Sequence, residues 1–140
     1  MNSNTANSNT AMRVPSWRSF VWAGVVGSIV AWSWAWYVGH GAQAVMLLFA
    51  FASVAFAYRA VAGVRIALVG LMVTGFVMFL ASLYWMFWVM MPTAATSAFD
   101  LASMSLFPMV FAVILLVGAV AGFRHIRDVS PSSSTSSAEA

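Results

Sequence analysis

Two arginines, Arg59 and Arg65, are the only charged residues between positions 41 and 99 of this 140-residue chain. A guanidinium group stays charged and costs about 2.5–3.5 kcal/mol at the centre of a bilayer on insertion scales. The uncharged segments on either side are each long enough to cross a membrane. We therefore expect the chain to return to the membrane surface at residues 59–65, and this turn constrains where the neighbouring helices begin and end.

The composition is that of a membrane protein. Hydrophobic residues make up 63% of the chain and charged residues 6%, with a mean hydropathy of +0.92. A soluble domain carries about 25% charged residues, so a water-exposed surface could not be covered here. Cysteine is absent, which excludes disulfides, thiolate metal sites and thiol nucleophiles. We expect the net charge of +3 to serve orientation in the lipid bilayer and contact with anionic lipids, not nucleic acid binding.

Uncharged segments predict four helices in an all-α, up-down transmembrane bundle. The predicted spans are residues 20–39, 41–58, 66–91 and 98–123. Ala42-Gln43-Ala44 resembles a signal-peptidase site, so a cleaved signal peptide is the competing interpretation of the first span. The length of that span and its continuation into another one favour a retained helix.

The chain ends and the fourth span carry further local signals. Residues 1–18 and 125–140 are polar and rich in small residues, and we expect disordered tails on either side of a transmembrane domain at 19–124. Ser97 and Asp100 have the spacing of a capping box, which predicts a helix start. Pro108 lies inside the fourth span and cannot donate a backbone hydrogen bond, so we expect a kink near residues 104–108.

The arginines are distributed asymmetrically along the predicted topology. They precede the first span, separate the second from the third, and follow the fourth, and the other two loops contain none: Arg13, Arg18, Arg59, Arg65, Arg124 and Arg127. By the positive-inside rule, both termini and the 59–65 turn are expected in the cytoplasm, with the protein in the cell membrane.

Small residues recur at helical spacing in three of the spans. They are Ala23, Gly27 and Ala31 in the first, Gly63, Ala67, Gly70 and Thr74 in the third, and Gly118 and Gly122 in the fourth. Such faces let helix backbones approach closely in a bilayer. Packing among the chain's own helices is one interpretation, and a surplus face for another membrane protein or for self-association is the other.

Aromatic residues gather near the predicted outer ends of the first and third spans. A candidate outer ligand or interface cluster consists of Trp32, Trp36, Trp85, Trp88 and His40. An aromatic belt at the headgroup level is the simpler interpretation, because Trp34 points almost opposite to Trp32 and Trp36. A stacking surface for a quinone, a lipid or another flat ligand is the alternative.

Reactive groups are scarce at membrane depth. The first three spans have no ionisable residue in their interiors, although coupled transporters normally place one there. The serines have no base at their depth, and His40 and His125 are expected on opposite sides of the bilayer. A copper site from His40 with Met86, Met90 and Met91 is the remaining metal hypothesis. We expect no catalytic, cofactor or metal site, and hence no enzyme.

The leading functional hypothesis is a non-catalytic membrane protein that acts through helix contacts. It would be an accessory or assembly subunit of a membrane complex, or a small immunity or exclusion protein. The alternatives are a small pore, holin-like protein or uncoupled transporter, and a membrane ligand sensor that uses the outer tryptophans.

Overall fold

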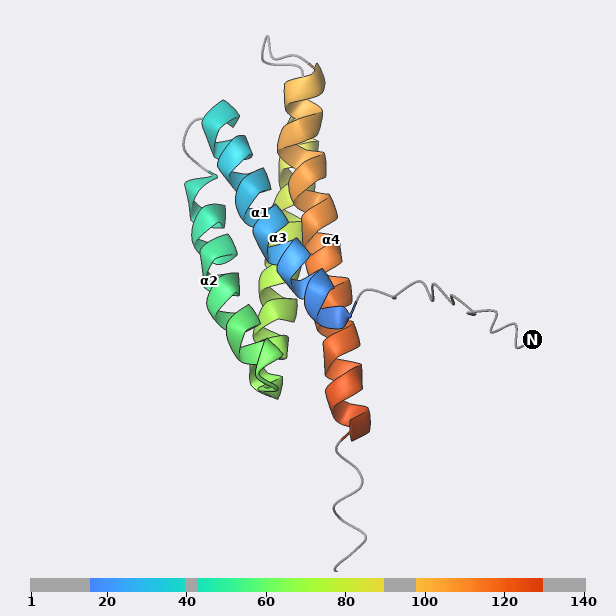
Figure 1. The fold of residues 1–140 in the computed structure, drawn as a ribbon. Helices are drawn as coiled ribbons and strands as arrows, with labels where there is room; N and C mark the ends of the chain where they lie inside the picture. Colours follow the sequence, from blue (N-terminus) through green and yellow to red (C-terminus); the bar gives the residue numbers. More distant parts are fainter. Residues whose placement is uncertain (1–15, 40–42, 90–97, 130–140) are drawn as a thin grey trace, which may run out of the picture.

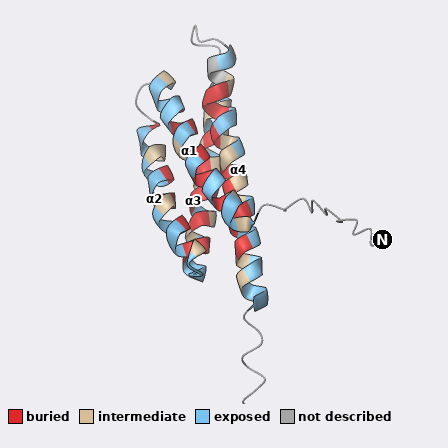
Figure 2. Ribbon diagram, in the orientation of Figure 1, coloured by how far each residue is buried: buried red, intermediate tan, exposed pale blue. Residues whose placement is uncertain are grey.

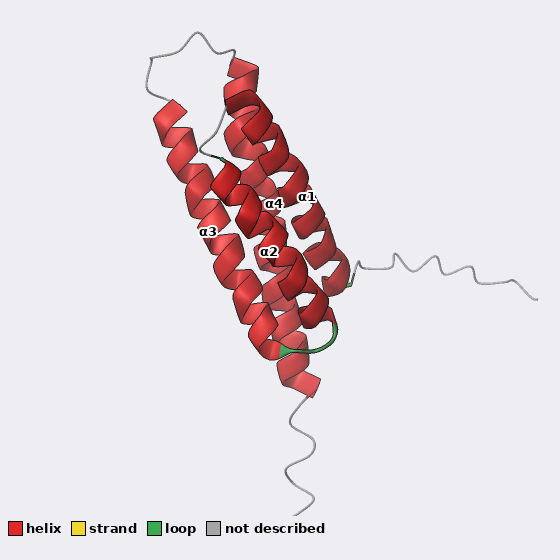
Figure 3. Ribbon diagram, turned by 90° about the vertical axis from the view of Figure 1, so that its left-hand side faces the viewer, coloured by secondary structure: helices red, strands yellow, loops and turns green. Residues whose placement is uncertain are grey.

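A computed structural model describes residues 16–39, 43–89 and 98–129. These residues form four α-helices: α1 (Trp17–Gly39), α2 (Ala44–Val61), α3 (Arg65–Val89) and α4 (Ala98–Val129). Successive helices run antiparallel in one elongated bundle (Figures 1 and 3). All four are long and apolar enough to cross a membrane, so the predicted all-helical architecture with four candidate spans is confirmed.

The helix boundaries differ from the predicted ones mainly at the ends of the bundle. Helix α1 already begins at Trp17, and α4 continues to Val129. The prediction of disordered tails is therefore wrong for residues 17–18 and 125–129. Helix α4 continues because Phe123 and Ile126 pack against the buried core. The helix therefore still has an apolar face after Arg124, the first charged residue of this segment.

Helix α4 packs against both α1 and α3, and α2 packs against the other sides of α1 and α3. The approach of α1 and α4 is the tightest because glycines lie at the crossing. A Cβ atom on Gly118 would lie 2.8 Å from the backbone nitrogen of Val21, and one on Gly24 would overlap the backbone of Leu115. Only a hydrogen atom fits at these two positions.

The core lies between the facing sides of the helices, where Figure 2 shows the buried residues. Its largest fully buried side chains come from all helices except α2: Trp32, Leu68, Leu71, Met78 and Leu115. Helix α2 contributes small residues instead: Ala50, Ser53, Ala57 and Ala60. The bulk of the interior is therefore supplied by α1, α3 and α4.

The turn between α2 and α3 ends α2 with a Schellman motif. The backbone N–H of Val64 donates to the carbonyl of Arg59 at 3.1 Å, and that of Gly63 donates to Ala60 at 3.0 Å. Gly63 has a φ of 95°, which side-chain-bearing residues rarely adopt. This compact turn holds the start of α3 close to the end of α2.

The predicted kink at Pro108 and the predicted capping box of Ser97 and Asp100 both remain predictions. Helix α4 is continuous through Pro108, which is buried, and the neighbouring Ser103 and Ser105 are buried as well. The kink itself stays a prediction. The proposed capping box lies outside the described residues, because Ser97 and the side chain of Asp100 are not among them.

Candidate functional site

One end of the bundle gathers the start of α1, the α2–α3 turn and the end of α4 (Figure 1). Five of the six arginines belong to these segments: Arg18, Arg59, Arg65, Arg124 and Arg127. We name it the arginine end. The sequence predicts all six arginines on one side of the membrane, and in the fold the three segments that carry these five lie at one end of the bundle. Arg13 lies outside the described residues.

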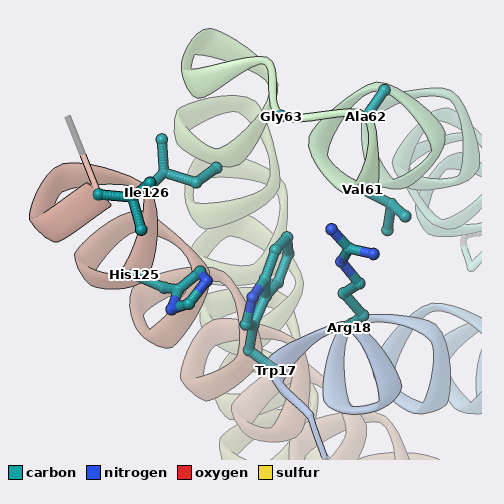
Figure 4. A pocket seen from close by; sticks show the side chains of 8 residues that line it. Trp17, Arg18, Val61, Ala62, Gly63, His125 and Ile126 are labelled. Carbon is teal, nitrogen blue, oxygen red and sulfur yellow. The ribbon is translucent and has the colours of Figure 1, made fainter.

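A pocket of about 260 Å³ opens at the arginine end, between α1, the α2–α3 turn and α4. Figure 4 shows the side chains around it. Its lining residues are Trp17, Arg18, Val61, Ala62, Gly63, His125, Ile126 and Val129. We name it the arginine-end pocket. It joins residues more than 100 positions apart in sequence, so no local pattern could have indicated it.

Trp17 forms a wall of the arginine-end pocket, and its position depends on Gly122. A Cβ atom on Gly122 would lie 2.6 Å from Cε3 of Trp17, so the indole rests directly on the backbone of α4. The guanidinium carbon of Arg18 lies 5.6 Å from the centre of the same ring, within the range of a cation–π interaction. The indole of Trp17 thus contacts both the backbone of α4 and the guanidinium of Arg18.

A second arginine ties α3 to the end of α4. Nη2 of Arg65 donates to the backbone carbonyl of Ile126 at 3.5 Å. This carbonyl belongs to the last turn of α4, where the helix leaves acceptors without intrahelical donors and the helix dipole favours a cation. This hydrogen bond is long and weak, and Arg65 is exposed.

The fixed charge in the lining of the arginine-end pocket is the guanidinium of Arg18. His125 lines the pocket as well, and no acidic side chain among the described residues does. The nearest acid in sequence, Asp128, lies 3.9 Å from Arg127, and both side chains are 73% exposed. Such an exposed pair is weak and screened by salt. The pocket is therefore suited to a negatively charged group.

The tryptophans predicted as one outer cluster do not share an environment. Trp32 is fully buried in the core, whereas Trp36 is half exposed on the bundle surface. Between them, Nε1 of Trp34 donates to Oγ of Ser103 at 3.0 Å and links α1 to α4. Trp85 is partly buried against the core. His40 and the side chain of Trp88 lie outside the described residues, and with His40 so does the copper hypothesis.

The predicted small-residue faces are mostly occupied within the chain. Ala31, Ala67 and Thr74 are buried, and an added Cβ would meet a neighbouring helix at every glycine of these faces except the turn residue Gly63. The contacts are Gly27 with Phe111, Gly70 with Phe56, Gly118 with Val21, and Gly122 with Trp17. Ala23 alone of the predicted helical positions is exposed. These contacts favour the interpretation of intramolecular packing.

Polar side chains inside the bundle mostly bond to their own helix. The hydroxyls of Ser53, Thr74 and Ser82 donate to carbonyls three or four residues earlier, at 2.6–2.8 Å. Ser28 Oγ, Trp32 Nε1 and Gln43 Oε1 are buried without a hydrogen-bond partner in the described part of the chain. Ser28 and Trp32 lie one helical turn apart on α1.

The described residues hold no group of three or more His, Cys, Asp or Glu that could bind a metal ion. The fold defines an all-helical protein with four candidate membrane-spanning helices, as in a multi-pass membrane protein. Comparison with protein-family models, with curated proteins and with solved structures finds no match to this chain.

Proposed function

We propose that this protein is a non-catalytic, multi-pass protein of the cytoplasmic membrane that acts by helix contact with another membrane protein. It would serve as an accessory or assembly subunit, or as an immunity or exclusion protein. The gathering of arginines at one end supports an orientation with that end, and both termini, in the cytoplasm.

The outward face of α2 carries this proposal. Only 22% of its apolar segment is buried, against 33–44% in the other three helices. Its fully buried positions are alanine and serine, whereas Leu48, Phe51 and Tyr58 are exposed. Met46, Leu47 and Val54 pack partly against the core. Helix α2 therefore buries mainly small residues and presents a large apolar surface.

The exposed face of α2 has small and large side chains arranged in a way that suits packing against another helix. Leu48, Ala52 and Ala55 are exposed and follow one another at helical spacing, so they form one stripe. Exposed aromatic side chains flank the stripe on both sides: Phe49 and Phe56 on one, Phe51 and Tyr58 on the other. The two alanines put less side-chain volume between the aromatic residues, so we infer that a partner helix could approach closely there. We name this surface the α2 groove.

To test this proposal, larger side chains are introduced at the α2 groove. Ala52→Leu and Ala55→Leu should abolish recovery of a membrane partner after cross-linking in cells and purification in mild detergent. Ala23→Leu, at an exposed position of α1, is the matched control and should retain the partner. Gly70 and Gly122 are unsuitable for this purpose because larger residues there would displace Phe56 and Trp17 inside the bundle.

Recovery of the wild-type chain only as a free monomer, even after cross-linking in cells, would refute the proposal. A partner that is retained equally by Ala52→Leu, Ala55→Leu and Ala23→Leu would exclude the α2 groove as the contact. Helical content measured by circular dichroism must be the same in all three variants for the comparison to hold.

The pore and sensor alternatives receive less support. The interior of one copy is filled by Trp32, Leu68 and Leu71, so a pore would require several copies. The outer tryptophans occupy different environments, so they do not form one stacking surface among the described residues. Flux of ions or dyes through liposomes at high protein density would reverse this ranking in favour of a pore.

A further inference from the structure

We propose that the arginine-end pocket binds the headgroup of an anionic phospholipid. The inference rests on the membrane insertion proposed above and not on the α2 groove or its partner. Its ligand is a phosphate diester carried by a lipid, recognised at the level where the helices reach the headgroup region.

The first argument is that the pocket carries positive charge at the level of the lipid headgroups. The arginine-end pocket is lined by the guanidinium of Arg18, and Arg65 donates a weak hydrogen bond to the carbonyl of the lining residue Ile126. Within the part of the chain that the structure describes, no acidic side chain lines it. It lies where α1 begins and α4 ends, which is the headgroup level for helices of this length. Basic pockets between helices at this level are suited to anionic headgroups.

The second argument is shape. The pocket volume of about 260 Å³ is several times the roughly 30 Å³ that one water molecule takes up in the liquid. In Figure 4 the indole of Trp17 stands between His125 of α4 and Arg18 of α1. The side chain of Arg18 extends toward Val61 and the α2–α3 turn. A phosphate in this space would be within the reach of a cation and against an aromatic wall.

The third argument is the division of the lining into a basic part and an apolar part. Val61, Ile126 and Val129 add aliphatic side chains from α2 and α4. A soluble anion needs no such surface, whereas the glycerol and the first methylene groups of a lipid do. The lining therefore fits a lipid headgroup better than a free phosphate.

The test measures retention of phosphatidylglycerol by the purified full-length chain, using native mass spectrometry in mild detergent. Phosphatidylcholine is the neutral comparison lipid, and soluble glycerol 3-phosphate tests binding of a free phosphate. We expect retention of phosphatidylglycerol over phosphatidylcholine and no retention of glycerol 3-phosphate. Equal retention of the two lipids, or of the soluble phosphate, would overturn the proposal.

Charge variants locate the site. Arg18→Gln should weaken phosphatidylglycerol binding about fivefold, which corresponds to the typical contribution of one basic residue near an anionic lipid. Arg127→Gln removes the same charge from the same end, at an exposed side chain outside the pocket lining, and should change binding less than twofold. An equal loss in both variants would show general attraction by the arginine end and would refute a defined site.

A steric variant keeps the charge constant. Ala62 is exposed and lines the pocket, so Ala62→Leu should reduce phosphatidylglycerol retention without disturbing the core. Ala44→Leu, at the exposed opposite end of α2, is its control and should bind as the wild type does. Undiminished binding by Ala62→Leu would place the lipid elsewhere.

Discussion

Gly24 of α1 lies directly against the backbone of Leu115 of α4: a Cβ atom on Gly24 would be 2.6 Å from the Cα of Leu115. The same antiparallel register pairs Val21 with Gly118 and Trp17 with Gly122. In a bilayer, where lipid is as apolar as the side chains, such close backbone contact supplies van der Waals attraction that larger residues would prevent. The α1–α4 pair is therefore the part of the bundle most sensitive to added volume.

Gly24→Ala should destabilise the bundle by about 1–3 kcal/mol, because the added methyl group forces the two helix backbones apart. Unfolding by sodium dodecyl sulfate in mixed micelles, followed by circular dichroism, measures this change. Ala23→Val, at the exposed neighbouring position, is the control and should be close to neutral. Equal stability of Gly24→Ala and wild type would contradict the α1–α4 register.

The hydrogen bond from Trp34 to Ser103 gives a second prediction. Trp34→Phe removes the indole donor and should lower the free energy of unfolding by about 0.6 kcal/mol, the average for hydrogen bonds between membrane helices. Trp36→Phe changes a half-exposed tryptophan two positions along the same helix and controls for loss of ring size. A larger effect in Trp36→Phe than in Trp34→Phe would argue against this bond.

Gly63 should tolerate substitution poorly for a conformational reason alone. Its φ is 95°, and nothing lies within 4 Å of a Cβ atom built on it. Gly63→Val should therefore cost about 1–3 kcal/mol through backbone strain. Gly63→Asn should cost less, since asparagine accepts a left-handed backbone more readily. Thermal unfolding in detergent compares the two variants, and the reverse order of stability would disprove the strained turn.

The proposed orientation is testable by cysteine labelling, because the natural chain has no cysteine to interfere. We expect Ala62→Cys and Asp128→Cys to react with a membrane-impermeant maleimide only after the cytoplasmic side is opened. His40→Cys should react in intact cells from which any outer membrane barrier has been removed. Labelling of Ala62→Cys from outside, or of Ala62→Cys and Asp128→Cys from different sides, would overturn the proposed topology.

The tryptophans of α1 show where sequence reasoning reached its limit. Helical periodicity places Trp34 on a different face from Trp32 and Trp36. It did not show that Trp32 is buried in the core while Trp36, one turn further, is half exposed. Every face of this helix is apolar, so the hydrophobic pattern that marks the inside of a soluble helix is missing here.

The end of α4 shows a second limit. The charged residues from Arg124 onward predicted a tail, yet the helix continues to Val129. Phe123 and Ile126 are three residues apart, so they lie on one apolar helix face. This spacing was the one indication in the sequence that the helix continues past Arg124. The carbonyl of Ile126 also receives Arg65 from α3, a contact across 61 positions that no local pattern indicates.

The sequence by itself determined the number of helices, the position of the turn between Arg59 and Arg65, and the collection of arginines at one end. These properties follow from the hydropathy and charge of each residue, which act locally against water and lipid. Tertiary structure decided which faces meet: Gly24 against Leu115, Trp17 over Gly122, and the pocket between α1 and α4. Such contacts depend on shape complementarity between helices that are distant in sequence. Because the helix surfaces are apolar on all sides, hydrophobicity alone does not mark which face of a helix is buried.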